Sequence, residues 1–168
     1  MYQFKRLRAP GFMLVESRPS AGDKHTKRFA AGTTPQNQGT FNLYLAGEFS
    51  LSIAATGFSQ RLTPGQTNLD LPPGATSPGV DVVERALSDG CWRMCLSPQD
   101  KAARWTRRIV VLAAGGVLEM AAGDLAVVLE GGAESAGEVL PLGAVAYAQE
   151  AMTIASAGGA RLAVARLL

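Results

Sequence analysis

Few side chains in this sequence could do chemistry. The single histidine is His25, and the two cysteines are Cys91 and Cys95. A catalytic cysteine needs a neighbouring base or cation to activate its thiol, but both cysteines fall on an apolar predicted strand. A Ser-His-Asp arrangement would also have to use His25, and the chain has no G-x-S-x-G turn. We therefore predict no catalytic residues, and we interpret His25, between Lys24 and Thr26, as a solvated loop residue.

The cysteines are predicted to be free, buried thiols. Cys91 and Cys95 are four positions apart, which in a strand places them on one side, roughly 13 Å apart. A disulfide needs Cα atoms within about 7 Å. Free thiols indicate a reducing compartment, and the N-terminal segment lacks the apolar core of a signal peptide. We therefore predict a cytoplasmic protein, or a virion component if a phage encodes it.

Other candidates favour structural roles. Glu130 and Glu134 are interpreted as turn residues and not as an acid/base pair. Trp92 and Trp105 could stack a sugar or a base, but we expect Trp92 in the core and Trp105 as a docking residue at a connector. The glycine clusters lack the Lys-Ser/Thr ending of a phosphate loop. No cofactor-binding residues and no cofactor are predicted.

Charge excludes one class of function and suggests another. The 168 residues carry a formal net charge of +2, too small to predict nucleic-acid binding. Charged residues make up 18%, below the usual quarter, which fits a protein that buries surface in an assembly. Basic residues gather in the first 28 positions and acidic ones in the C-terminal third. Both groups are either solvated loops or faces that meet between copies.

Short strands are expected throughout, since glycine and proline interrupt most helical windows. One short connecting helix is predicted over Ser97–Thr106, with Ser97 as N-cap, Pro98 in the first turn and Asp100 at the positive end of the dipole. No apolar run is long enough for a membrane helix. The predicted strands are 41–45, 48–54, 68–71, 80–87, 92–96, 108–112, 125–129, 138–140, 144–148, 152–155 and 161–167. This spacing is typical of a sandwich or barrel.

The two halves of the chain resemble each other, with glycines where strands end and the chain turns back. Neither half is large enough to bury its apolar face alone. The matched segments are 29–32 with 112–115, 44–47 with 128–131, 62–65 with 140–143, and 86–90 with 154–159. The first half has the longer loop, 72–79, and a polar loop, 33–40.

The second half resembles the cupin family. Its segments follow the family's order of a strand ending in glycine, a second glycine-ended strand, a glycine turn, a strand with a pocket residue and a closing strand. These segments are VLAAG (111–115), LAVVLEGGAES (125–135), GEVLPLGAVAYAQE (137–150) and ARLAVARL (160–167). The first half matches more loosely. The resemblance implies an all-β cupin-like jelly roll of two related β-repeats. We place the N-terminal repeat with its basic arm at 1–98, the connector at 99–107 and the C-terminal repeat at 108–168.

The resemblance also implies a divalent metal held by three histidines and a glutamate, and this set does not transfer. Where the family's first histidines would lie, residues 116–123 offer only Glu119, and the last histidine would fall near Thr153. A transition-metal site needs about three or four converging ligands. We therefore predict no metal.

Three functions remain open. The first is a non-enzymatic structural or assembly protein that binds copies of itself or other subunits. An accessory component of a bacteriophage capsid or tail is one protein of this kind. The second is a small-molecule or sugar-binding cupin with the ligand inside one barrel. The third is a cupin enzyme with an atypical metal site. No membrane and no specific nucleic acid are predicted as partners.

Overall fold

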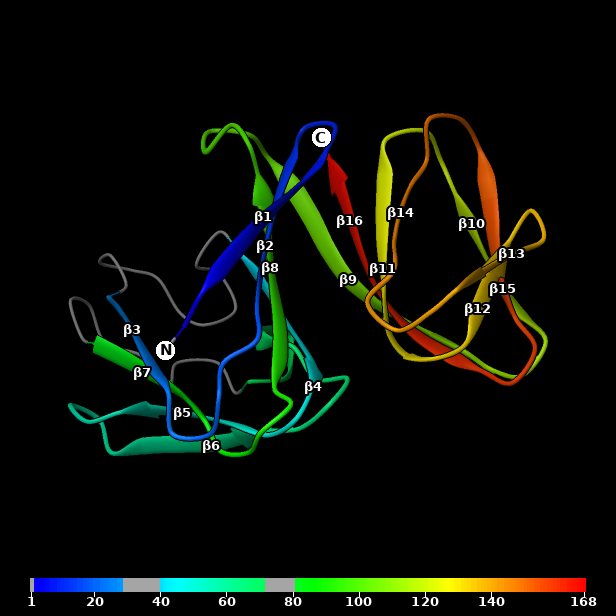
Figure 1. Cartoon of the computed structure of the whole chain (residues 1–168). Coiled ribbons are helices and arrows are strands. Elements are labelled where there is room, and N and C mark those ends of the chain that lie inside the picture. The colour runs from blue at the N-terminus through cyan, green and yellow to red at the C-terminus, as the bar shows by residue number, and fades with distance from the viewer. Residues whose placement is uncertain (1, 29–39, 72–80) are drawn as a thin grey trace. The chain divides into compact units, whose positions relative to one another are not determined.

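The computed structural model describes residues 2–28, 40–71 and 81–168 of an all-β protein (Figure 1). Within these residues the helical segment is one turn of 3-10 helix, η1 (Asn68–Asp70). The chain forms two compact units. The N-terminal unit contains Met1–Leu7 and Leu14–Ser97, and the C-terminal unit contains Arg8–Met13 and Pro98–Leu168. None of the described segments is a helix long and apolar enough to cross a membrane.

The N-terminal unit is built on two four-stranded sheets. The first has the order β1 (Phe4–Ala9), β2 (Phe12–Ser17), β8 (Trp92–Pro98) and β4 (Phe41–Ala46). The second has the order β3 (Lys24–Arg28), β7 (Asp81–Ala86), β5 (Phe49–Ile53) and β6 (Phe58–Leu62). Side chains from both sheets share one core, in which Tyr44 packs with Phe49, Leu51 and Ile53.

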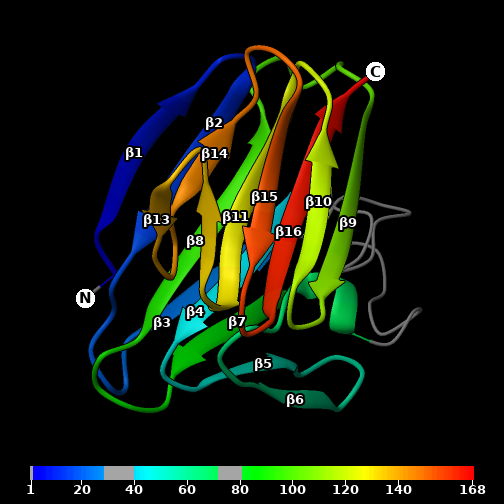
Figure 2. The same cartoon turned by 90° about the vertical axis from the view of Figure 1, so that its right-hand side faces the viewer.

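The C-terminal unit also has two four-stranded sheets (Figure 2). One has the order β14 (Val145–Tyr147), β11 (Asp124–Gly131), β16 (Ala160–Leu167) and β9 (Trp105–Leu112). The other has the order β10 (Gly116–Met120), β15 (Met152–Ser156), β12 (Ala133–Ser135) and β13 (Glu138–Leu140). Their facing sides enclose a hydrophobic core cluster that includes Leu118, Met120, Ile154 and Leu162.

The two units repeat one strand order, which confirms the predicted repeat. In the first sheet, β2, β8 and β4 of the N-terminal unit take the places of β9, β16 and β11. In the second sheet, β3, β7, β5 and β6 take the places of β10, β15, β12 and β13. Even the short strand β14, which pairs with β11, has a counterpart in an isolated bridge between Leu43 on β4 and Thr67.

Matched glycines turn the chain identically in the two units. Gly65 and Gly143 both have positive φ. The Gly65 N–H donates to the Tyr44 carbonyl at 2.8 Å, and the Gly143 N–H donates to the Val128 carbonyl at 2.8 Å. This pairing confirms the predicted match of 62–65 with 140–143.

One part of the sequence match is wrong. Gly115 was paired with Gly32, but its structural counterpart is Gly22. The Gly115 N–H donates to the Ser156 carbonyl at the end of β15, and the Gly22 N–H donates to the Ala86 carbonyl at the end of β7, both at 2.8 Å. The sequence match relied on the Ala-Ala-Gly triplet that ends at both Gly32 and Gly115. Such triplets recur by chance, because glycine and alanine are frequent throughout the chain. The segment 29–32 itself lies outside the described residues, as do 33–39 and the loop 72–79.

The predicted helix over Ser97–Thr106 is also wrong. Strand β8 continues through Pro98, and β9 begins at Trp105. Between them, Asp100 closes a tight turn: its carboxylate accepts from the Ala102 N–H at 2.9 Å, and its carbonyl accepts from the Ala103 N–H at 3.0 Å. Asp and Ser favour such turns for the same reason that they cap helices, since their side chains bond nearby N–H groups.

Other element boundaries differ where local patterns were weak. The predicted strand 68–71 is η1, capped by Thr67 and Asp70. The expected basic arm contains strands β1, β2 and β3, while β6, β10 and β12 were not predicted. In β3 the polar sequence hides the strand, because alternation of polar and apolar residues is the sequence signal for a strand.

Candidate functional site

The candidate site is the inner face of the N-terminal unit, which is polar where the inner face of the C-terminal unit is apolar. Tyr44 pairs with Arg93 across β4 and β8, and the equivalent pair across β11 and β16 is Val128 with Leu162. Both sheets have a register shift directly after this pair. The equivalence therefore holds residue by residue.

The same substitution of polar for apolar recurs on the facing sheet. Glu84 on β7 pairs with His25 on β3, and the equivalent pair across β15 and β10 is Ile154 with Leu118. Six inner positions match in this way. With the residue of the N-terminal unit first, they are Asn42 and Ala126, Tyr44 and Val128, Glu84 and Ile154, Arg93 and Leu162, His25 and Leu118, and Lys27 and Met120. The fold thus accepts apolar residues at all six positions.

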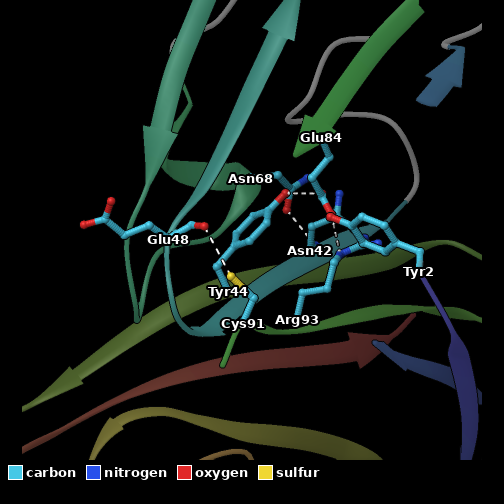
Figure 3. A network of polar contacts seen from close by, with 8 residues as sticks. All are labelled: Tyr2, Asn42, Tyr44, Glu48, Asn68, Glu84, Cys91 and Arg93. Atoms are coloured by element: carbon cyan, nitrogen blue, oxygen red, sulfur yellow. Dashed lines mark hydrogen bonds and ion pairs between the residues drawn. The ribbon is translucent and has the colours of Figure 1, made fainter. Parts of the chain in front are cut away.

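Glu84 is the centre of the polar cluster (Figure 3). Only 1% of the residue is exposed. One carboxylate oxygen, Oε2, accepts the Tyr44 hydroxyl at 2.8 Å, and the other, Oε1, accepts the Tyr2 hydroxyl at 3.0 Å. The Arg93 Nε lies 3.2 Å from Oε1 in a buried ion pair. Both carboxylate oxygens of Glu84 are therefore occupied by groups of the protein.

Arg93 extends the cluster to the edge of β4 (Figure 3). Its Nη2 donates to Asn42 Oδ1 at 2.9 Å, and the Asn42 N–H donates to Asn68 Oδ1 at 2.9 Å. The Arg93 Nε faces Glu84 Oε1 in the ion pair, but among the described residues it makes no contact with hydrogen-bond geometry.

The cluster shifts the pKa values of its members. Burial raises the pKa of Glu84, but Arg93, Lys27 and the two tyrosine hydroxyls outweigh burial and lower that pKa below its ordinary value. Burial and the Glu84 carboxylate raise the pKa of Tyr44 and of Tyr2. Glu84 is thus held as a carboxylate and both tyrosines as phenols, which is the protonation state that the hydrogen bonds require.

Two further basic residues face this cluster from β3. His25 and Lys27 are partly buried, while Lys24 and Thr26, which precede them, are exposed. Burial, followed by Arg93, lowers the pKa of Lys27, and burial, Lys27 and Arg93 lower the pKa of His25. The His25 ring lies 5.6 Å from the Tyr2 ring and 5.2 Å from the Phe4 ring, measured between centroids. The interpretation of His25 as a solvated loop residue is therefore wrong.

His25 is expected to make stability depend on pH. Since its folded-state pKa is depressed, the unfolded chain binds more protons just below the ordinary value of 6.5, and stability falls as pH drops through that range. His25 is the chain's single histidine. We expect the thermal midpoint to fall between pH 7.5 and pH 5.5, and the variant His25→Gln to fall less. Equal falls in the two proteins, measured by calorimetry, would contradict this assignment.

The cysteines and tryptophans do not form a site with His25. Both cysteines are free, as predicted; Cys91 is buried and Cys95 is partly buried. The Cys91 thiol contacts the carbonyls of Ser88 and Glu48 at 3.1 and 3.3 Å. Trp92 is half-buried on β8 and not in the core: its indole N–H donates to Glu16 at 3.2 Å, and the Arg18 guanidinium lies 4.2 Å from its ring centroid.

The remaining candidates lie on strands of the C-terminal unit. Trp105 begins β9, with its ring centroid 6.4 Å from that of Phe12. Glu130 and Glu134 are exposed on β11 and β12, so both are strand residues and not turn residues.

The C-terminal barrel does not fit the metal centre that the family resemblance implies. Glu119 and Thr153 pair across β10 and β15, and both are exposed, while their neighbours Leu118, Met120 and Ile154 fill the interior. A carboxylate on the outer face of a sheet cannot converge with ligands inside it. Across residues 2–28, 40–71 and 81–168, no group of three or more His, Cys, Asp and Glu side chains is placed to hold a metal ion.

Comparison with known proteins identifies the fold. No protein-family model matches the chain, and no curated protein matches it in sequence. Among solved structures, a cupin 2 conserved barrel domain protein from Leptotrichia buccalis aligns with a TM-score of 0.60 at 12% identity, covering 100% of this chain and 89% of that one. HutD from Pseudomonas fluorescens aligns with a TM-score of 0.55 at 13% identity, covering 94% and 80%.

An oxalate decarboxylase also aligns, with a TM-score of 0.52 at 8% identity, covering 93% of this chain and 68% of that one. These likenesses and the repeated strand order define a two-repeat protein with the cupin fold, as the sequence predicted. The structures that share this fold include an enzyme, so the fold by itself does not decide whether this chain catalyses a reaction. Whether the chain binds a ligand or catalyses a reaction depends on the residues of its inner faces.

Proposed function

We propose that this protein binds a small molecule inside its N-terminal cupin barrel. The observation that carries the proposal is the contrast between the inner faces of the two repeats. Glu84 and Arg93 occupy positions where the C-terminal repeat has Ile154 and Leu162. Since the apolar pair satisfies the same fold, folding alone gives no reason for the charged one.

The energetic cost of burying this ion pair supports a role in binding. Removing a carboxylate and a guanidinium from water costs several kcal/mol for each ion, and well-packed apolar residues are often as stabilising or more so. Ligand sites in proteins combine a mainly apolar lining with a few convergent polar groups. The N-terminal barrel combines both kinds of residue, since Phe49, Leu51 and Ile53 pack with Tyr44, a member of the polar cluster.

A lumen-swap variant tests the proposal. It carries Asn42→Ala, Tyr44→Val, Glu84→Ile and Arg93→Leu, so that the N-terminal inner face takes the residues of the C-terminal one. We expect at least one member of a diverse set of metabolites and sugars to raise the thermal midpoint of the natural protein by several degrees, as binding at a hundred times Kd stabilises by about 2.7 kcal/mol. The same compound should leave the variant unchanged.

The matched control for this experiment is Arg85→Ala. Arg85 lies next to Glu84 on β7, but its side chain is exposed on the outer face. This variant should respond to the compound as the natural protein does. Stabilisation of the lumen-swap variant by every active compound would overturn the proposal.

Assembly is the second candidate function, and exposed apolar side chains favour it. In the C-terminal unit, Val111 is 74% exposed, Val117 56% and Val139 77%. Such residues can form contacts between copies. A monomer at high micromolar concentration in light scattering would argue against this candidate. A place in a virus particle is part of this candidate and rests on analogy with other jelly-roll proteins. A cytoplasmic location is proposed from the free cysteines, and the absence of catalysis from the lack of a recognised catalytic motif in the sequence.

A further inference from the structure

The ligand class follows from the charges that the N-terminal barrel leaves without partners, and this inference rests on the proposed function. Arg93 is balanced by Glu84. Lys27 has no such counter-ion: among the described residues it makes neither a hydrogen bond nor an ion pair. The barrel therefore holds more positive than negative charge at its polar cluster.

Lys27 faces the cluster by virtue of its register. It pairs with Val82 on β7, which is 1% exposed, and it lies two positions from His25, the partner of Glu84. Positions two apart in a strand share a face. Lys27 therefore lies on the same face of β3 as His25, the residue opposite Glu84. Burial and then Arg93 lower the pKa of Lys27, while Glu84 raises it.

Lys27 and Arg93 can form further hydrogen bonds only as donors. Arg93 is 98% buried, and its contacts with described residues are the ion pair of its Nε with Glu84 and the hydrogen bond of its Nη2 to Asn42. Lysine and arginine side chains have no acceptors. The Glu84 oxygens, which could have received a cation, already accept two hydroxyls and face the guanidinium.

We propose that the N-terminal barrel binds a small oxyanion, of the carboxylate class, through the Lys27 ammonium and those N–H groups of the Arg93 guanidinium that contact neither Glu84 nor Asn42. A carboxylate supplies the acceptors that both side chains lack and the negative charge that the cluster lacks. Hydrogen bonds between ionised partners are stronger than neutral ones. A neutral analogue of the same shape lacks that negative charge, so we expect it to bind more weakly.

Direct titration of the whole protein tests this proposal. The probes are benzoate, succinate and inorganic phosphate, each compared with chloride at equal ionic strength, and benzamide as the neutral counterpart of benzoate. Binding is measured by calorimetry and by the chemical shift of the Arg93 Nε–H in the ¹⁵N-labelled protein. We expect at least one anion to bind and shift that resonance, and benzamide to bind at least about tenfold more weakly than benzoate if benzoate binds.

Two matched variants locate the site. Lys27→Met introduces the residue that stands at the equivalent position of the other repeat, Met120, so the fold should tolerate it. Lys24→Met makes the same change on the exposed face of the same strand. We expect Lys27→Met to weaken anion binding at least about tenfold, Lys24→Met to leave it unchanged, and Lys27→Arg to restore most of it.

Each other outcome overturns the inference in a distinguishable way. If benzamide binds as tightly as benzoate and shifts the Arg93 resonance, the barrel binds ligands but does not select anions, and the proposed function survives. If an anion binds equally to the Lys24 and Lys27 variants, it binds elsewhere. If no anion binds while a neutral compound from the wider screen stabilises the protein, the inference fails alone; if nothing binds at all, the proposed function fails with it.

Discussion

Replacing Glu84 with isoleucine is expected to lower the free energy of unfolding of the N-terminal unit by about 3–5 kcal/mol. The change leaves the Arg93 guanidinium buried, with 3% of its side chain exposed, and without its counter-ion. It also removes the acceptor of the Tyr44 and Tyr2 hydroxyls. Arg93→Leu should cost a similar amount, since it leaves Glu84 without its cation.

The double variant should cost no more than the worse single change. Once both charges are gone, Ile and Leu can pack as Ile154 and Leu162 do in the C-terminal unit, and neither member of the pair is left as a buried ion without the other. The expected coupling energy between Glu84 and Arg93 is about 3 kcal/mol. This pattern separates a coupled buried pair from two independent core residues, whose costs would add.

The measurement is urea unfolding in a Trp105→Phe background. Trp92 then reports the N-terminal unit, since Trp105 belongs to the C-terminal unit. The exposed ion pair between Arg61 and Glu48, at 3.6 Å with side chains 72% and 46% exposed, supplies the matched control. Its double-mutant cycle should give less than about 1 kcal/mol. A Glu84–Arg93 coupling as small as that of the control would show that the buried pair is not what the geometry indicates.

The substitution Gly131→Ala is expected to destabilise the C-terminal unit by about 2–5 kcal/mol. Gly131 has a φ of 78°, which costs a residue with a side chain about 1–2 kcal/mol. An added Cβ would also overlap the carbonyl oxygen of Gly159 and lie 3.0 Å from the Ala160 Cα. Both are backbone atoms where β16 begins, so they cannot rotate away.

Substitutions at two nearby glycines distinguish the cost of backbone strain at Gly131 from the cost of the steric overlap of an added Cβ. Gly137 has a φ of 80° and open space around its Cβ direction, so Gly137→Ala should cost only the backbone strain. Gly132 has open space and no positive φ, so Gly132→Ala should change stability by less than about 0.5 kcal/mol. The free energies come from urea unfolding followed by Trp105 fluorescence in a Trp92→Phe background. A Gly131→Ala variant no less stable than Gly137→Ala would contradict the close approach of the two chain segments.

The sequence predicted the β class and the repeat because both depend on local signals. Alternation placed Phe49, Leu51 and Ile53 on one face, and all three are buried in β5. Glycine spacing matched Gly65 with Gly143, because a turn that needs positive φ strongly favours glycine wherever it recurs. The same reasoning failed for Gly115, whose counterpart is Gly22 and not Gly32. It also failed at Ser97–Thr106, where Asp100 closes a turn and does not begin a helix.

The candidate site was missed because its residues are far apart in sequence. Glu84 and Arg93 were read only as members of predicted strands, and His25 as part of a loop. One signal was present: once the repeats are aligned on Gly90 and Gly159, Arg93 falls opposite Leu162, each lying three residues after its glycine. A charged residue at a core position of a related repeat marks a functional candidate, since the fold does not need it.

What the sequence determined by itself is therefore the kind of structure: short strands, glycine turns and two copies of one pattern. What only the tertiary structure decided is which side of each strand faces inward and which residues meet there. Alternation divides a strand into two faces but does not say which one is covered. The pairing of β3 with β7 and of β4 with β8 brings His25 beside Glu84 and Tyr44 beside Arg93, because sheet register is set by strands far apart in the chain.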